Sequence, residues 1–254
     1  MSTYVISDIH GQLNAFKGML SMISFNYTSD KLYLLGDYVD WGPESIKTLQ
    51  YIMELTSKYG NIKALIGNHD LMMYNVISNI PNNYSFEQAY DVGYKVDYGC
   101  WFENSGDITL AKYIRLSDEE KSSIKKFLTT LPYYAVTDEI NGEIYYLCHS
   151  KPFVRGMRLE DVVWDRIVDS RLPRSFIDRT DKAILVSGHT ITVNYNSYDD
   201  NGMLKIYKSP NNRYINIDCG AKLLGKKRVC RLAAIRLEDL EEFYIDSEMI
   251  SLCD

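Results

Sequence analysis

Three apolar runs near the start of the chain each end in a short polar motif: TYVISDIH at residues 3–10, KLYLLGDYVD at 31–40 and IKALIGNHD at 62–70. Apolar side chains recur at helical spacing in the two stretches between them, residues 12–22 and 44–59. This alternation predicts a β-α-β-α-β unit with parallel strands at 3–7, 31–35 and 62–66. Because ligands bind beyond the carboxyl ends of parallel strands, we expect the polar motifs to meet at one edge of the sheet.

The rest of the chain is expected to add helices first and then strands, giving an α/β protein. Residues 84–131 should be mainly helical, with a helix start at Ser117-Asp118-Glu119-Glu120. Asn141-Gly142, between residues 134–140 and 143–148, predicts a β-hairpin. Further strands are expected at 183–186, 203–207, 214–218 and 231–236. The sequence shows no repeat and no linker, so we expect a single domain over residues 1–254 with a helical insert at 84–131.

The composition narrows the class of protein. The 254 residues carry a formal net charge of -6, so no overall positive field attracts nucleic acid or a membrane surface. No apolar stretch is long enough to span a bilayer, and residues 1–6 lack the features of a signal peptide. The 5 cysteines are scattered without a Cys-x-x-Cys pair, which is typical of reduced thiols. We therefore expect a cytoplasmic protein that binds neither nucleic acid nor a membrane.

All 4 histidines of the chain lie in short motifs that follow expected strands. These motifs are Asp8-Ile9-His10-Gly11, Gly67-Asn68-His69-Asp70, Cys148-His149-Ser150 and Gly188-His189-Thr190. A fifth motif, Gly36-Asp37-Tyr38-Val39-Asp40, adds two carboxylates. Any one of these motifs has a simple structural explanation, such as a turn at 36–40 or a core histidine at 149. Their joint occurrence, in order and each after a strand, favours a site for two metal ions.

Two neighbouring divalent ions need hard oxygen and imidazole ligands, with one carboxylate able to bridge them. We expect the first ion at Asp8, His10 and Asp37, and the second at Asp37, Asn68, His149 and His189. Asp37 is the natural bridge between the ions. A hydroxide bridging them would be held ready for in-line attack on phosphorus.

His69 neighbours an expected ligand and is left free for proton chemistry. We predict that it acts as the general acid that protonates the leaving oxygen. An imidazole in that role needs a carboxylate to orient it. Asp40 is the first candidate for that partner and Asp70 is the second.

The motifs resemble those of the calcineurin-like metallophosphoesterases. The similarity is greatest to the phosphoprotein-phosphatase branch, which includes bacterial and phage enzymes and the symmetrical diadenosine tetraphosphatases. Besides the motifs above, it includes Trp164-Asp165-Arg166 and Ile217-Asp218-Cys219-Gly220, so it covers nearly the whole chain. The resemblance implies two mixed β-sheets flanked by helices, with the metal site on loops at strand ends. It also implies the ligand roles given above, an Asp40–His69 acid, and manganese as the metal, with iron and zinc as alternatives.

Position 41 departs from the family pattern. The family has an arginine there that binds the substrate phosphate, whereas this chain has Trp41, whose indole offers no charged donor. Arg166 matches the family's second phosphate-binding arginine, and Asn68 is also expected to contact the phosphate. Arg155 and Arg158 are nearby in sequence and are either helpers or ordinary surface charges. Trp41 is interpreted either as a substrate contact that stacks on an aromatic group or as a packing residue.

The substrate indications are divided. Gly36-Asp37-Tyr38-Val39-Asp40 resembles the phosphoprotein phosphatases, whereas Gly67-Asn68-His69-Asp70-Leu71 resembles the diadenosine tetraphosphatases, which usually lack the aspartate at 40. We predict hydrolysis of phosphate monoesters, with a phosphoserine or phosphothreonine protein as substrate. A dinucleoside tetraphosphate is the alternative. A metal-free binding module and a nuclease are rivals from other classes, opposed by the intact ligand set and the acidic net charge respectively.

Overall fold

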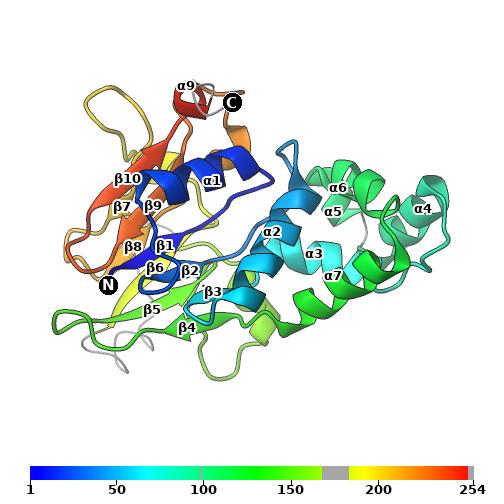
Figure 1. The fold of residues 1–254 in the computed structure, drawn as a ribbon, viewed down its shortest axis with the longest axis horizontal. Helices are drawn as coiled ribbons and strands as arrows, with labels where there is room; N and C mark the ends of the chain where they lie inside the picture. The colour runs from blue at the N-terminus through cyan, green and yellow to red at the C-terminus, as the bar shows by residue number, and fades with distance from the viewer. Residues whose placement is uncertain (98, 168–182, 251–254) are drawn as a thin grey trace.

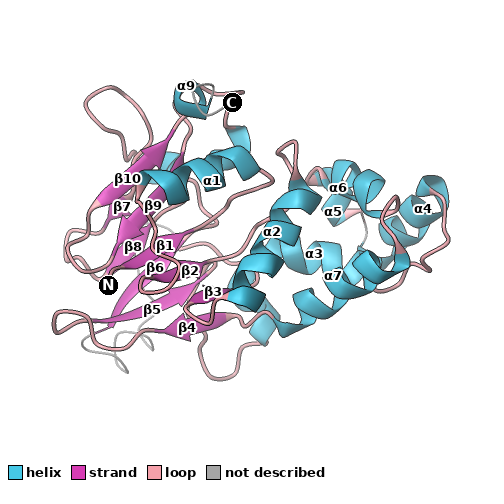
Figure 2. Ribbon diagram, viewed as in Figure 1, coloured by secondary structure: helices cyan, strands magenta, loops and turns pink. Residues whose placement is uncertain are grey.

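The computed structural model describes residues 1–97, 99–167 and 183–250. Two five-stranded mixed sheets pack face to face, and helices cover the outer face of the first sheet (Figures 1 and 2). This arrangement confirms the α/β fold with two mixed sheets that the sequence predicts.

The first sheet has the strand order β10-β9-β1-β2-β3. Its strands are β1 (Thr3–Ile6), β2 (Lys31–Leu34), β3 (Ile62–Ala64), β9 (Leu232–Arg236) and β10 (Glu242–Ile245). β1, β2 and β3 are parallel, while β9 and β10 extend the sheet in antiparallel pairs. The parallel part is the predicted β-α-β-α-β unit, because α1 (Leu13–Met22) and α2 (Ser45–Lys58) connect its strands.

The second sheet has the strand order β4-β5-β6-β8-β7. Its strands are β4 (Tyr134–Val136), β5 (Ile144–Cys148), β6 (Ala183–Ser187), β7 (Tyr207–Lys208) and β8 (Tyr214–Asn216). β4 and β5 form the predicted hairpin, with Asn141 and Gly142 at positive φ in its turn. β5, β6 and β8 are parallel, so their carboxyl ends lie at one edge, as those of β1 to β3 do.

Alternation along the strands divides the core into layers. Val5, Tyr33 and Leu65 of the first sheet pack against Leu147 and Val186 of the second. The residues that alternate with them in the first sheet, such as Ile6 and Leu34, pack against the helices instead. Both faces of β1 and β2 are therefore buried, which explains their continuous apolar sequence.

The segment between β3 and β4 is helical, as predicted for residues 84–131, and lies on the right in Figure 1. It contains α3 (Asn68–Ile77), α4 (Phe86–Asp97), α5 (Cys100–Glu103), α6 (Gly106–Tyr113) and α7 (Asp118–Thr130). The predicted start of α7 is a capping box, in which Ser117 and Glu120 exchange side-chain and backbone hydrogen bonds. Short helices occur elsewhere at η1 (Leu159–Val163), η2 (Thr192–Tyr195), η3 (Ala221–Leu223) and α9 (Ser247–Ile250).

Three elements differ from the sequence-based expectations. The strand expected at 203–207 is wrong apart from Tyr207, because Leu204 forms only an isolated bridge with Tyr198. Leu204 and Ile206 are apolar because they fill the core between the sheets, not because they belong to a strand. Helix α3 and strand β10 were not expected: α3 begins on the polar motif itself, and β10 is a partly polar edge strand.

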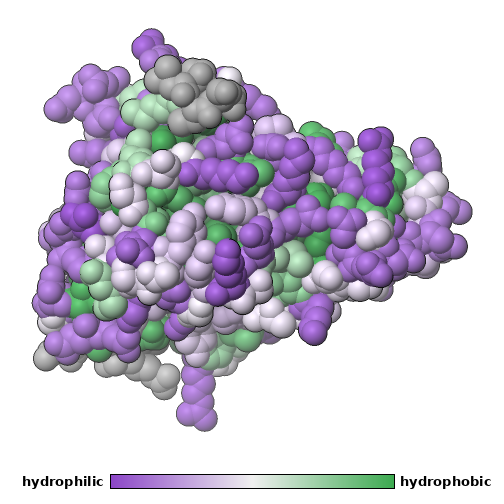
Figure 3. All heavy atoms as spheres, viewed as in Figure 1, coloured by the Kyte–Doolittle hydropathy of each residue, from purple (hydrophilic) through white to green (hydrophobic). Residues whose placement is uncertain are grey.

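The face of the molecule drawn in Figure 3 is largely hydrophilic, with hydrophobic side chains visible only in small areas. Among the described residues, no helix has the length and apolar character needed to cross a membrane.

Candidate metal centre

The predicted ligands meet where strands of both sheets end. Each lies within four residues of the end of a strand: Asp8 and His10 follow β1, Asp37 follows β2, Asn68 follows β3, His149 follows β5 and His189 follows β6. All six side chains are buried. The site therefore needs both halves of the chain, because each sheet supplies part of the ligand set.

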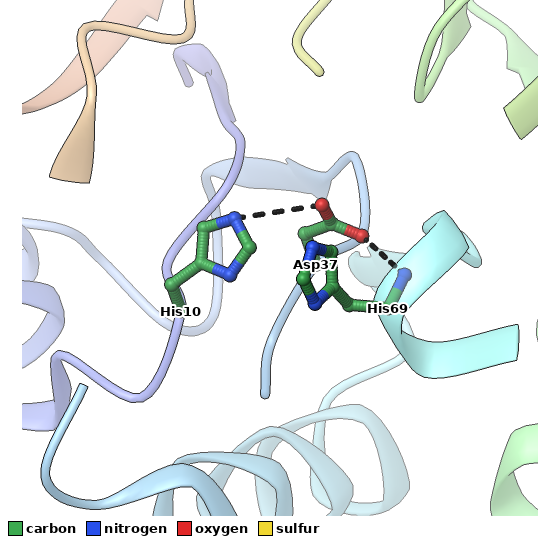
Figure 4. Close-up of side chains that lie close together, drawn as sticks. All are labelled: His10, Asp37 and His69. Carbon is green, nitrogen blue, oxygen red and sulfur yellow. Dashed lines mark hydrogen bonds and ion pairs between the residues drawn. The ribbon is translucent and has the colours of Figure 1, made fainter. Parts of the chain in front are cut away.

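Asp37 lies between two groups of possible ligand atoms. Its Oδ2 is 3.5 Å from Nε2 of His10 on one side and 3.4 Å from Nε2 of His149 on the other. Its second oxygen, Oδ1, accepts a hydrogen bond of 2.9 Å from the backbone N–H of His69 (Figure 4). The carboxylate is thus fixed with one oxygen turned toward both imidazoles, as a bridging ligand requires.

The group on the His149 side, which also contains Asn68 and His189, is more compact than the group on the His10 side. Oδ1 of Asn68 is 3.0 Å from Nε2 of His149 and 2.9 Å from Nδ1 of His189, and the two ring nitrogens are 3.2 Å apart. In the group on the His10 side, Oδ1 of Asp8 is 4.0 Å from the same Nε2 of His10 that faces Asp37. These distances suit atoms that surround a common ion.

The other ring nitrogen of three histidines faces a backbone carbonyl. The contacts join His10 Nδ1 to Val39 O at 2.9 Å, His149 Nδ1 to Leu35 O at 2.9 Å and His189 Nε2 to Trp164 O at 3.2 Å. Because a carbonyl oxygen only accepts, these nitrogens carry the protons, and the opposite nitrogen of each neutral ring presents a lone pair to the site. Lone pairs that converge on the oxygens of Asp37 and Asn68 repel one another unless a cation lies between them. The donor set therefore fits divalent metal ions.

Burial shifts the pKa of these groups toward their neutral forms. It raises the pKa of Asp8 and of Asp37 well above the usual range, and lowers that of His189 to about 2. Burial also lowers the pKa of His10 well below its usual range, so His10 and His189 remain unprotonated at neutral pH and available to a metal. A bound cation would favour the ionised carboxylates that burial alone disfavours.

The backbone at the site is held in a sparsely populated conformation. Of the twelve non-glycine residues with positive φ in the described chain, six belong to the site motifs, with φ between 47° and 69°. They are Asp8, His10, Asp37, Asp40, Trp41 and His189. Such backbone strain is stored at functional sites, where surrounding contacts impose it.

Two glycines let the loops approach closely. A Cβ at Gly188 would overlap the Asp8 carboxylate and Ser7, and a Cβ at Gly67 would overlap Asp37. The backbone N–H of His189, next to Gly188, donates to both oxygens of Asp8 at 3.1 and 3.0 Å. Glycine at 188 thus allows a loop of the second sheet to hold a ligand from the first.

The structure pairs His69 with Asp40, the first of its two candidate partners. Nδ1 of His69 is 2.7 Å from Oδ2 of Asp40, which also accepts a hydrogen bond of 2.9 Å from the indole N–H of Trp101. The other oxygen, Oδ1, accepts one of 2.6 Å from the Thr109 hydroxyl. Asp70 instead accepts from the backbone N–H groups of residues 37, 38 and 67, so it holds the loops in place.

The Asp40–His69 pair is arranged to hold one proton. Burial raises the pKa of Asp40 to about 8, against the effect of the hydrogen bonds from Thr109 and Trp101, and lowers the pKa of His69 to about 3. A neutral carboxyl beside a neutral imidazole and a carboxylate beside an imidazolium contain the same number of protons. In either form the pair has one proton to transfer at neutral pH.

Five of the six predicted ligands, all except His149, line a pocket of about 120 Å³ together with His69. Arg166 also lines it, and its Nη1 donates to the carbonyl of His189 at 3.0 Å and to the Thr190 hydroxyl at 3.2 Å. Asn104, Trp164 and Lys222 complete the lining. A pocket of this size accommodates a phosphate group rather than a whole drug-sized ligand. The rest of a substrate must therefore lie outside it.

Three residues that the sequence offers as possible substrate contacts lie away from this pocket. Trp41 is half-buried and is not among the lining residues, and neither are Arg155 and Arg158. Arg158 forms an exposed ion pair with Asp161 at 2.9 Å. Conversely, no pattern in the sequence points to Trp101, Thr109, Asn104 or Lys222, because none of them lies in a motif.

A family model for calcineurin-like phosphoesterases matches residues 1–217. The chain belongs to this family. The resemblance seen in the motifs is thereby confirmed, and the two-sheet fold agrees with it.

Two bacterial enzymes are similar in sequence to part of this calcineurin-like phosphoesterase. The symmetrical bis(5'-nucleosyl)-tetraphosphatase of Pectobacterium atrosepticum is 40% identical over 83 residues, which are 33% of this chain and 28% of the relative. That of Buchnera aphidicola subsp. Schizaphis graminum is 42% identical over 83 residues, 33% of this chain and 29% of the relative. The matches thus span less than a third of the length of either relative.

Two crystal structures share the fold. One is of a candidate diadenosine tetraphosphatase, with a TM-score of 0.60 at 16% identity, covering 96% of this chain and 93% of the other. The second is the cold-active protein-tyrosine phosphatase of a Shewanella species, with a TM-score of 0.55 at 16% identity, covering 96% and 80%. At such low identity these similarities concern the fold alone.

Proposed function

We propose that this protein hydrolyses dinucleoside tetraphosphates at a site with two divalent metal ions. The similarity in sequence to symmetrical bis(5'-nucleosyl)-tetraphosphatases, 40% identity over 83 residues, carries this choice of substrate. We give this similarity more weight than the motif at residues 36–40, which favours a phosphoprotein substrate. The proposed ligands are Asp8, His10, Asp37, Asn68, His149 and His189, whose donor atoms converge as described above.

Manganese is the metal that we propose, as the family resemblance implies, while the set of carboxylate, amide and imidazole ligands also suits iron and zinc. When bound, such a pair of ions acidifies water and withdraws charge from a phosphate group. The chain supplies the rest of the chemistry. Arg166 and Asn68, both in the pocket lining, are proposed to hold the phosphate oxygens.

His69 is proposed to protonate the leaving oxygen, with Asp40 fixing the orientation of its ring. Hydrolysis then breaks the bond between phosphorus and the bridging oxygen, and the departing group leaves with the proton from His69. A symmetrical cleavage adds one water across the central bridge and yields two nucleoside diphosphates. The 2.7 Å contact between His69 and Asp40 supports this assignment.

A phosphoserine or phosphothreonine protein is the second candidate substrate, and the Asp40–His69 pair is the observation that favours it. A serine or threonine alkoxide is far more basic than a nucleoside diphosphate, so its departure depends more strongly on a general acid. A buried pair whose carboxylate accepts hydrogen bonds from two further side chains, Trp101 and Thr109, is well suited to that demand.

Turnover of the two substrates distinguishes these candidates. The manganese-loaded full chain is assayed with diadenosine tetraphosphate and with a phosphoserine/phosphothreonine peptide, and kcat/KM is compared. The Asp37→Asn variant, prepared in the same way, measures contaminating phosphatase activity. A kcat/KM at least about tenfold higher for the dinucleotide, with ADP as sole product, supports the proposal. The opposite ratio would replace it by the second candidate.

A further inference from the structure

The indole of Trp41 occupies the family's arginine position, and two lysines lie over it. Nζ of Lys222 is 5.3 Å from the centre of the Trp41 ring and Nζ of Lys226 is 5.8 Å from it. Lys226 also contacts the Trp41 carbonyl at 3.5 Å. Both lysines come from η3 and the turn after it, in the last part of the chain. Because a cation within about 6 Å of an indole face is attracted to it, this contact restrains lysine side chains that would otherwise move freely.

Lys222 alone of these two lysines lines the metal pocket. It shares that lining with Arg166, with Asn68 and with four of the acidic and imidazole ligands. No carboxylate of the described residues forms an ion pair with it. Its charge therefore remains available to a ligand. A lysine ammonium is an ordinary phosphate-binding group, acting as a point charge where arginine acts as a fork.

Trp41 has no direct route to the phosphate. It does not line the pocket, and its indole Nε1 is buried without a hydrogen-bond partner in the described structure. The positive φ of Trp41, 64°, belongs to the strained loop that also places Asp40 against His69. What Trp41 offers to the site is the face of its ring, and Lys222 lies over that face.

We propose that Lys222 binds the substrate phosphate in place of the arginine absent from position 41, and that Trp41 acts as a positioning residue for Lys222. The proposal rests on the proposed phosphate chemistry of the pocket, but not on the identity of the substrate. The cation is supplied by a distant segment of the chain, and the indole at position 41 fixes it where it can reach a phosphate beside Arg166.

Binding of inorganic phosphate to the manganese-loaded full chain tests the proposal directly. We compare the wild type with Lys222→Met by isothermal titration calorimetry, and measure the inhibition constant of phosphate with an aryl phosphate substrate. Loss of a hydrogen bond to a charged group should weaken phosphate binding by about 10- to 100-fold. The metal content should stay at the wild-type value, because Lys222 is not a ligand. Lys222→Arg should retain most of the affinity.

Lys227→Met is the matched control. It removes the same charge from the same turn, but Lys227 is exposed and outside the pocket, so phosphate affinity should change by less than about twofold. Trp41→Leu should weaken phosphate binding by about two- to fivefold in the wild type, the range of an exposed cation–π contact. In the Lys222→Met background the same change should have no further effect, because Trp41 acts through Lys222.

Wild-type affinity in Lys222→Met would overturn the proposal, and so would equal losses in Lys222→Met and Lys227→Met or the absence of phosphate binding by the wild type. Failure of the proposed function has a different signature. In that case phosphate binds and depends on Lys222, while diadenosine tetraphosphate is not hydrolysed.

Discussion

The indole N–H of Trp101 donates a hydrogen bond of 2.9 Å to the Asp40 carboxylate, which in turn contacts His69 at 2.7 Å. Trp101 is fully buried in α5, and Thr109 of α6 donates to the other oxygen of Asp40. The helical segment thus reaches into the site through the one carboxylate that orients the proposed acid. Its packing is thereby linked to the proton chemistry.

Removing the Thr109 hydroxyl should impair protonation of the leaving group without removing the metals. In Thr109→Val we expect turnover of an alkyl phosphate to fall by about tenfold, the effect of one hydrogen bond to a charged group. Turnover of a dinitrophenyl phosphate, whose leaving group needs little protonation, should change by less than about threefold. Thr109→Ser is the conservative control and should retain wild-type rates. Equal losses for both substrates would instead indicate a general structural defect.

His69→Asn should separate proton transfer from metal binding. We expect metal content to be preserved while kcat falls by about 10² to 10⁴, the usual range for loss of a general acid. His149→Asn serves as the contrasting variant, because it removes a proposed ligand and should reduce metal content. The rings of His10 and His69 are close, with centroids 4.7 Å apart. Loss of metal from His69→Asn would therefore make His69 a ligand and refute its assignment as the acid.

Removing the metal should affect both activity and stability. Excess chelator should abolish hydrolysis of an aryl phosphate, and added Mn²⁺ should restore it. A ligand at about 100 times its Kd stabilises the folded state by about 2.7 kcal/mol, so the stripped protein should melt roughly 5–10 °C lower by calorimetry. Hydrolysis that persists in excess chelator would contradict the metal-dependent mechanism.

Gly188→Ala should damage the site through sterics alone. The added methyl group overlaps the Asp8 carboxylate and Ser7, so we expect a loss of about 1–3 kcal/mol in the free energy of unfolding. Metal affinity should fall by about 10- to 100-fold, as for loss of other groups that orient ligands. Gly60→Ala is the matched control, since a Cβ there has no neighbour within 4 Å. Chemical denaturation and metal titration measure the two effects. Wild-type metal affinity in Gly188→Ala would show that the loop adjusts freely.

Local patterns in the sequence are sufficient to predict most of the fold. The apolar runs before Asp8, Asp37 and Asn68 predicted β1, β2 and β3, because buried parallel strands require continuous apolar sequence. The segment at 203–207 shows the limit of this approach. Leu204 and Ile206 are buried in the core although neither belongs to a strand, because apolar sequence indicates burial more directly than it indicates hydrogen bonding.

The sequence by itself determined which groups gather at the strand ends, because every proposed ligand lies within four residues of a strand end and strand polarity places those ends together. Only the tertiary structure decided between Asp40 and Asp70 as the partner of His69, and brought Trp101 and Lys222 to the site. Those contacts join segments far apart in the chain, and no local periodicity or spacing encodes them. They exist because packing of the helical segment and of the η3 turn against the sheets fixes side chains whose neighbours in sequence carry no motif.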